Sequence, residues 1–101
     1  MRHATPTALD QLEALLLELR KFGLLREKKR GSFYRGSSGF LHFHEDPAGM
    51  FADVKLDGVE FTRRRVSSEA EQRALVAAVR RALNEPGARS GSRARGPGRC
   101  G

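Results

Sequence analysis

Leucines recur every three or four positions in the first quarter of the chain, which is the spacing of one face of an α-helix. This stripe predicts a helix that begins near Thr5-Pro6 or Thr7, because threonine caps helices and Pro6 suits the first helical position. Its predicted end is Phe22-Gly23, since glycine adopts the left-handed conformation found just past many helices. The apolar positions are Leu9, Leu12, Leu15, Leu16 and Leu19.

A second apolar stripe, later in the chain, predicts another helix. Ser68 and Glu71 have the spacing of a capping box, so the helix is expected to begin there. It is expected to stop before Pro86, because proline cannot continue a helix. The stripe consists of Leu75, Ala78, Val79, Ala82 and Leu83.

Between the two helices the apolar residues recur at every second position, which is typical of strands. Four strands are predicted, with the sequences SFYRG (32–36), FLHFHE (40–45), MFADVKL (50–56) and VEFTRRRV (59–66). Asp57-Gly58 predicts a two-residue hairpin, and DPAG (46–49) predicts a four-residue turn. The predicted fold class is α+β: a two-layer sandwich of order α-β-β-β-β-α, with a four-stranded antiparallel meander and two helices packed on one face.

These turns also fix which side chains share a face of the sheet. The 46–49 turn places His42 opposite Asp53, and the 57–58 turn places Asp53 opposite Thr62. One face is apolar and is expected to pack against the helices; it carries Leu41, Phe43, Met50, Ala52, Val54, Leu56, Val59 and Phe61. The other face is expected to stay open; it carries Phe40, His42, His44, Phe51, Asp53, Lys55, Glu60, Thr62 and Arg64.

The net charge of +7 is unevenly distributed along the 101 residues. Residues 87–101 contain four arginines, no acid and no large apolar side chain, so a disordered tail is predicted there, after a single α+β domain at 1–86. Cys100 is the only cysteine, which excludes an internal disulfide. No apolar run approaches the roughly 20 residues of a membrane span, so we expect a cytoplasmic location and no membrane partner.

Seven positions on the open face are predicted to form a binding surface: Phe40, His42, His44, Phe51, Asp53, Thr62 and Arg64. Within it, the imidazoles of His42 and His44 and the carboxylate of Asp53 are a candidate ligand set for zinc or iron. A structural arrangement is the alternative, with His42 paired to Asp53 and His44 stacked on Phe51. A third interpretation gives a histidine beside a carboxylate a role in proton transfer or ligand contact.

The segment KKRGSFYRG (28–36) interleaves cations with aromatic rings. This pattern is typical of surfaces that bind single-stranded nucleic acid, and also of a solvated loop that leads into an edge strand. The candidate nucleic-acid contacts are Lys28, Lys29, Arg30, Tyr34 and Arg35. The sequence has no phosphate-binding glycine pattern and no serine nucleophile motif, so no cofactor and no catalytic residue is predicted.

The run FLHFHEDPAGMFADVKL (40–56) resembles the central segment of a group of small bacterial proteins described as having a luciferase domain. In that group a strand of the type F-x-H-x-H leads through an acidic glycine turn into a strand of alternating hydrophobic residues. The matching positions are Phe40, His42, His44, Gly49 and Leu56. The resemblance covers residues 32–56 and implies no established activity.

The sequence therefore favours a small, non-enzymatic binding domain of unknown partner that uses its open sheet face, with a symmetric homodimer as one candidate assembly. Nucleic-acid binding through residues 28–35 and the arginine-rich tail is the first alternative. A metal-dependent or histidine-based enzyme centred on His42, His44 and Asp53 is the second.

Overall fold

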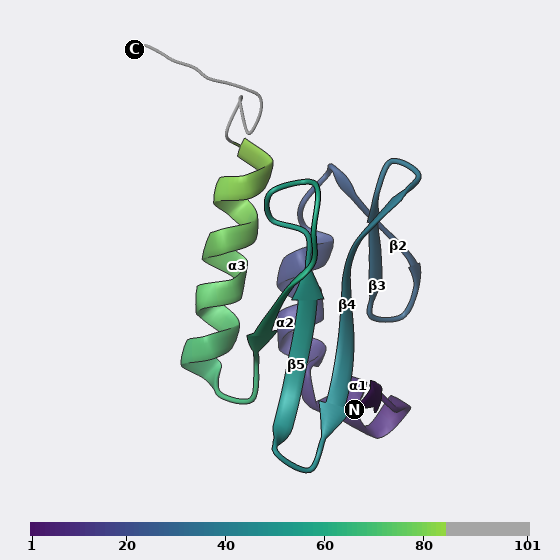
Figure 1. Ribbon diagram of the computed structural model, residues 1–101, viewed down its shortest axis with the longest axis vertical. Helices are drawn as coiled ribbons and strands as arrows, with labels where there is room; N and C mark the ends of the chain where they lie inside the picture. Colours follow the sequence, from purple (N-terminus) through teal and green to yellow (C-terminus); the bar gives the residue numbers. More distant parts are fainter. Residues whose placement is uncertain (85–101) are drawn as a thin grey trace.

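The computed structural model describes residues 1–84, which form three helices and a six-stranded antiparallel sheet (Figure 1). The chain runs β1 (Arg2–His3), α1 (Pro6–Gln11), α2 (Glu13–Arg20), β2 (Leu25–Lys29), β3 (Ser32–Arg35), β4 (Ser38–Asp46), β5 (Gly49–Val54), β6 (Thr62–Arg65) and α3 (Glu69–Asn84). The predicted α+β class is confirmed. The predicted domain end at residue 86 and the tail at 87–101 lie outside the described residues.

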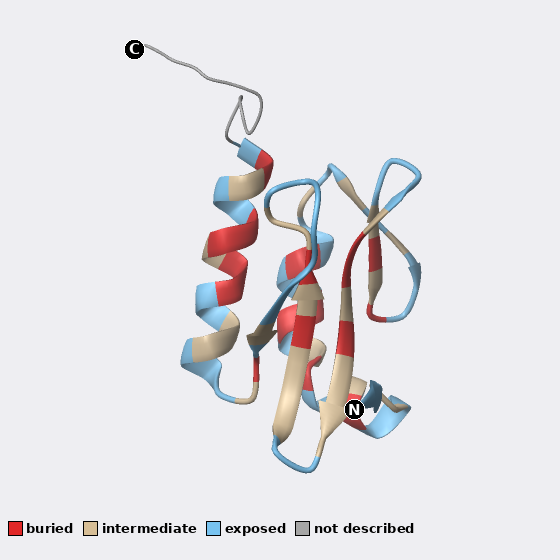
Figure 2. Cartoon of the chain, viewed as in Figure 1, coloured by how far each residue is buried: buried red, intermediate tan, exposed pale blue. Residues whose placement is uncertain are grey.

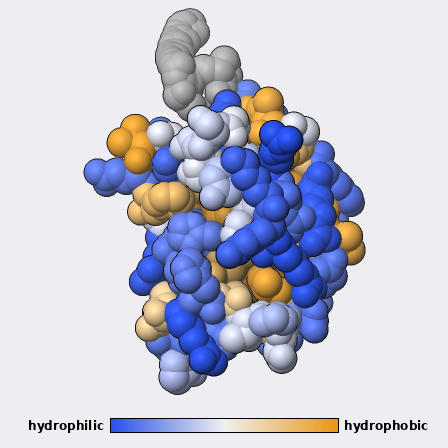
Figure 3. All heavy atoms as spheres, turned by 90° about the vertical axis from the view of Figure 1, so that its right-hand side faces the viewer, coloured by the Kyte–Doolittle hydropathy of each residue, from blue (hydrophilic) through white to orange (hydrophobic). Residues whose placement is uncertain are grey.

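The predicted element order and four-stranded meander are wrong, because the sheet contains two further strands. β1 pairs with the end of β4, and β2 pairs with β3, giving the order β2-β3-β4-β5-β6 with β1 beside β4. β2 has the sequence LREKK, which lacks the alternation of apolar residues that predicts a strand, and it forms an edge of the sheet. Charged side chains discourage an edge strand from pairing with other chains. Figure 3 views the molecule from the β2–β3 side, where hydrophilic side chains predominate.

The predicted first helix is interrupted at Leu12, whose backbone angles (φ −97°, ψ 7°) separate α1 from α2. Thr5 caps α1 as predicted, because its Oγ1 accepts a hydrogen bond from the Ala8 N–H at 3.3 Å. α2 ends at Arg20, before the predicted end at Phe22-Gly23. The leucine stripe nevertheless continues across the break, so both short helices turn apolar side chains toward the sheet.

The capping box predicted for the last helix is confirmed. The Glu71 N–H donates to Ser68 Oγ at 3.1 Å, and the Ser68 N–H donates to Glu71 Oε1 at 2.9 Å. α2 and α3 contact each other and lie on one side of the sheet, where the buried residues gather (Figures 1 and 2). The most deeply buried side chains of this core are Phe33, Leu12, Leu16, Leu19, Leu41, Leu75, Val54, Val66 and Val79.

The register between β4 and β5 is the predicted one, with His42 opposite Asp53. The register between β5 and β6 differs by one residue, because Asp53 lies opposite Arg63 instead of Thr62. The connection is longer than the predicted two-residue hairpin: the Asp57 carboxylate accepts hydrogen bonds from two backbone N–H groups of the loop, at 2.8 and 2.9 Å. A slip of one residue exchanges the two faces of a strand.

Two predicted members of the binding surface therefore lie on the opposite face. Thr62 is paired with Val54 and Arg64 with Ala52, and both partners belong to the core. Cross-strand partners share a face, so Thr62 and Arg64 turn toward the helix layer. Phe61, predicted to be in the core, is 45% exposed in the β5–β6 loop.

Phe40 is the third predicted member of the binding surface that lies elsewhere, and the cause is a β-bulge. Phe33 pairs with Leu41, but Tyr34 pairs with Gly39, so Phe40 is an extra residue in β4. A bulge interrupts the alternation of side chains between the two faces of a strand. Phe40 consequently lies in the hydrophobic core, with 3% of its surface exposed.

Candidate functional site on the open sheet face

Asp53 lies at the centre of a cluster of ionisable side chains on the face of the sheet away from the helices. The pairing of β4 with β5 places His42 directly opposite Asp53, and His44 projects from the same face. The His44 Nε2 atom lies 3.2 Å from Asp53 Oδ2, and the His42 Nε2 atom lies 3.7 Å from the same oxygen. The predicted grouping of these three side chains is therefore confirmed.

β1 adds a third histidine to the cluster, which no local sequence pattern predicted. His3 is paired with His44, and their ring centroids lie 4.9 Å apart with 29° between the ring planes. The His3 ring also lies 6.1 Å from the ring of His42. His44 thus stacks on His3, whereas the sequence predicted stacking on Phe51, its partner across β5.

Glu45 holds the segment that carries His3 against the sheet. Its Oε1 accepts a hydrogen bond from the Thr5 N–H at 2.6 Å, and its Oε2 accepts one from the Arg2 guanidinium at 3.3 Å. The hydrogen bond from the Thr5 backbone, with further help from the Thr5 hydroxyl and Arg2, lowers the pKa of Glu45 below its ordinary value. The ionised carboxylate is therefore the form that anchors β1 beside the site.

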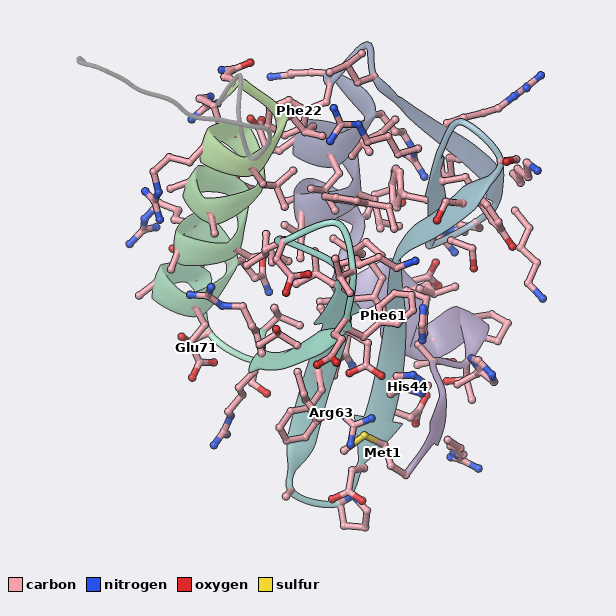
Figure 4. The ribbon with its side chains drawn as sticks, turned by 45° about the horizontal axis from the view of Figure 1, so that its top comes forward. Met1, Phe22, His44, Phe61, Arg63 and Glu71 are labelled. Atoms are coloured by element: carbon pink, nitrogen blue, oxygen red, sulfur yellow. The ribbon has the colours of Figure 1, made fainter. Side chains whose placement is uncertain are left out.

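Arg63 occupies both oxygens of the Asp53 carboxylate. Its Nε donates to Oδ1 at 2.8 Å, and its Nη2 donates to Oδ2 at 3.0 Å, which is a bidentate pair. These hydrogen bonds lower the pKa of Asp53; burial opposes them, and the charges of Arg63, His44 and His42 add to the lowering. Figure 4 shows Arg63, His44 and Phe61 gathered over β4 and β5.

His42 is held toward its neutral form by its surroundings. Partial burial lowers the pKa of His42, and the neighbouring His44, His3 and Arg63 side chains lower it further, while Asp53 acts in the opposite direction. A neutral imidazole keeps one ring nitrogen as an acceptor, which is the form that binds a metal ion or takes a proton.

Two neighbouring aromatic rings, each with a lysine ammonium beside it, form a band across the sheet next to this cluster. The Lys28 ammonium lies 4.4 Å from the centre of the Tyr34 ring, and the Lys55 ammonium lies 5.0 Å from the centre of the Phe61 ring. Gly39 lies between the two rings, since a Cβ placed there would be 3.9 Å from both. Phe61 in turn contacts the His42 ring edge-on, with centroids 5.1 Å apart.

A groove joins this band to the histidine cluster. It has a volume of about 480 Å³ and is lined in part by His3, Lys28, Lys29, Ser32, Tyr34 and His42. The polar residues of its lining are two lysines, a serine, a tyrosine and two histidines. Such a lining favours an anionic ligand.

Within residues 1–84, cations outnumber the carboxylates at the strand positions of the open face. Cross-strand pairing places Arg26 beside Tyr34, Arg63 beside Asp53 and Arg65 beside Phe51. The cations on this face are Arg26, Lys28, Lys29, Lys55, Arg63 and Arg65, and the carboxylates at its strand positions are Asp46 and Asp53.

The structure divides the predicted site residues into two groups. Those on the open face are His42, His44, Phe51, Asp53, Lys28, Lys29 and Tyr34. Those elsewhere are Phe40, Thr62, Arg64, Arg30 and Arg35. Arg30 donates to Asp10 at 2.7 Å and to Glu13 at 2.8 Å, on α1 and α2, so its charge is already paired. Arg35 is paired with Leu25, which packs on the core.

No protein-family model, no curated protein and no solved structure matches this chain. The resemblance to proteins with a luciferase domain therefore stays a prediction. Within residues 1–84, none of the helices is both long enough and apolar enough to cross a bilayer.

Proposed function

We propose that this chain is a non-enzymatic binding domain whose open sheet face takes single-stranded nucleic acid. The observation that supports the proposal is a band of two neighbouring rings, Tyr34 and Phe61, each with a lysine ammonium beside it, from Lys28 and Lys55 respectively. Exposed aromatic rings stack on unpaired bases, and neighbouring cations contact the backbone phosphates. The open sheet face suits an extended strand, because bases can stack on rings that lie side by side.

Charge favours a polyanion over a second copy of this chain. A symmetric dimer formed through the open face would bring the same cations of both copies together, which like-charge repulsion opposes. A nucleic-acid backbone supplies one negative charge per nucleotide and releases counterions on binding. Lys28, Lys29 and Tyr34 of the basic segment 28–35 lie on this face, which supports the proposal.

The test is the affinity of the full chain for a fluorescein-labelled oligouridylate, followed by anisotropy across a series of NaCl concentrations. Phe61→Ala is expected to weaken binding about fivefold or more, because one base–ring stack is worth about 1–3 kcal/mol. The matched control is Leu17→Ala, since Leu17 is exposed to a similar degree (52% against 45%) but lies on α2. This control is expected to bind like the wild type.

Lys28→Gln is expected to lower the slope of log affinity against log salt by about one unit, because one phosphate contact is lost. Arg81→Gln, on α3, removes the same charge from the helix layer and is expected to leave the slope almost unchanged. Both variants retain residues 85–101, so any contribution of the arginines there is common to them. Equal binding by the wild type and Phe61→Ala would overturn the proposal. Light scattering that shows a dimer abolished by Phe61→Ala would instead assign the face to a second copy.

A further inference from the structure

We propose that His42, His44 and Asp53 form a binding site for a divalent transition-metal ion of the zinc class, and that Arg63 competes with the ion for Asp53. One ligand atom from each of the three residues lies within 4.8 Å of the other two. Both imidazoles direct Nε2 at the same oxygen, Asp53 Oδ2, at 3.2 and 3.7 Å. The proposal does not depend on nucleic-acid binding.

These distances match the edges of a zinc coordination polyhedron. Zinc binds imidazole nitrogen and carboxylate oxygen at about 2.0–2.2 Å, so two ligand atoms of a tetrahedral site are about 3.3–3.5 Å apart. The observed separations of 3.2 and 3.7 Å from Asp53 Oδ2 lie on either side of that value. The ligand atoms of the two histidines lie within 4.8 Å of each other. Nitrogen and oxygen donors in this ratio suit zinc or iron better than calcium or magnesium.

The backbone holds the three ligands in place before the ion binds. His42 and His44 come from β4 and Asp53 from β5, and these strands are paired without interruption from Leu41 to Asp46. The side chains of His44 and Asp53 are each 14% exposed, so an ion is partly desolvated yet reachable from solvent. His3 packs against both histidines and restricts their rings, which makes it a positioning residue. Three protein ligands leave one tetrahedral position for water or for an oxygen of a bound ligand.

A metal ion that binds Asp53 must displace the guanidinium of Arg63. Its Nη2 donates to Asp53 Oδ2, the same oxygen that the imidazoles approach. The Arg63 side chain is 51% exposed and belongs to the edge strand β6, so the guanidinium can turn into solvent without disturbing the core. A guanidinium near a divalent cation is also repelled by it. If the cluster binds a metal ion, removal of the Arg63 side chain is therefore expected to strengthen metal binding. If the cluster is purely structural, the same change is expected only to destabilise it.

The experiment is a titration of the full chain, purified without a histidine tag, with cobalt(II) and then with zinc in competition. The wild type is expected to bind one equivalent and to give the visible absorption of tetrahedral cobalt(II). His44→Gln and Asp53→Asn are each expected to lower the affinity at least tenfold, with folding checked by circular dichroism. Absence of binding by the wild type, or unchanged binding by these variants, would overturn the proposal.

The sharpest comparison is between Arg63→Gln and Arg65→Gln. Both remove one positive charge from β6, and both positions face the open side, but only Arg63 contacts Asp53. We expect Arg63→Gln to raise the zinc affinity several-fold and Arg65→Gln to change it by less than twofold. Equal effects would show that net charge alone acts and would overturn the role of Arg63. If a histidine variant unfolds, the shift of the His42 and His44 ring resonances on addition of zinc to the wild type decides whether the site exists.

Discussion

At the residue scale, Gly49 controls the turn that aligns the histidines with Asp53. It is the first residue of β5 and has a φ angle of +142°, which residues with a side chain rarely adopt. A Cβ there would lie 2.5 Å from Ser67 Oγ, the atom that accepts the Met50 N–H. Gly49→Ala is therefore expected to lower the free energy of unfolding by about 1–3 kcal/mol, measured by urea denaturation.

Gly23→Ala is the control for this substitution. No atom lies within 4 Å of a Cβ at Gly23, and its φ is outside the positive range. Alanine there is expected to change the free energy of unfolding by less than about 0.5 kcal/mol, as surface substitutions usually do. An equal loss in the two variants would show that Gly49 is not strained.

At the element scale, Glu27 joins β2 to α2 and to the turn that follows β2. Its carboxylate accepts from Arg20 Nε at 2.6 Å and from the Gly31 N–H at 2.9 Å. Burial by itself would raise the pKa of Glu27, but the hydrogen bonds from Arg20 and Gly31 outweigh it and lower the pKa below its ordinary value of 4.5. A carboxyl group whose pKa is lowered on folding stabilises the fold above its unfolded pKa.

Glu27→Gln is therefore expected to cost about 1–2 kcal/mol of the free energy of unfolding at pH 7, because a charged hydrogen bond is lost. The difference from the wild type should shrink as the pH falls through the lowered pKa, since the wild-type carboxylate then takes up a proton. Urea denaturation at several pH values below 7 measures this. Glu18→Gln is the control, because Glu18 contacts Lys21 only at the exposed surface of the helix, and we expect almost no change there. A pH-independent loss would mean that the Glu27 charge is unimportant.

The strands show which parts of the site the sequence could predict. Alternation and a four-residue turn were enough to align His42 with Asp53, because both signals are local. The β5–β6 register could not be predicted in this way. Asp57-Gly58 is typical of a two-residue hairpin, but in the structure the Asp57 carboxylate accepts hydrogen bonds from backbone N–H groups of its own loop, and the connection is longer. A single-residue slip then placed Arg63 beside Asp53 and moved Arg64 away. His3 reaches the site through a two-residue strand that only tertiary pairing creates.

At the scale of the whole molecule, the helix layer contains charges of both signs, whereas cations outnumber acids at the strand positions of the open face. The helix layer carries paired acids: Glu13 binds both Arg20 and Arg30, and Glu69 faces Arg73 on α3. The open face carries cations whose pairing is incomplete, beside exposed rings. The cations beside exposed rings favour binding of a polyanion at the open face. The candidate metal site lies within the surface that would contact nucleic acid.

The two proposals are therefore coupled through Arg63. When Asp53 binds an ion, the Arg63 guanidinium loses its partner and becomes available to a phosphate, so zinc should tighten oligonucleotide binding. We expect an increase of about 3- to 10-fold at constant ionic strength, within the usual range of coupling between sites. In Arg63→Gln, zinc should increase the oligonucleotide affinity by a smaller factor, because no guanidinium is released. The increase that remains measures the effect of the charge of the ion alone. Anisotropy titrations of both proteins, with zinc and with a chelator, measure the two effects. By reciprocity the oligonucleotide must raise the zinc affinity by the same factor, and equal zinc effects in the two proteins would show that Arg63 does not carry the coupling.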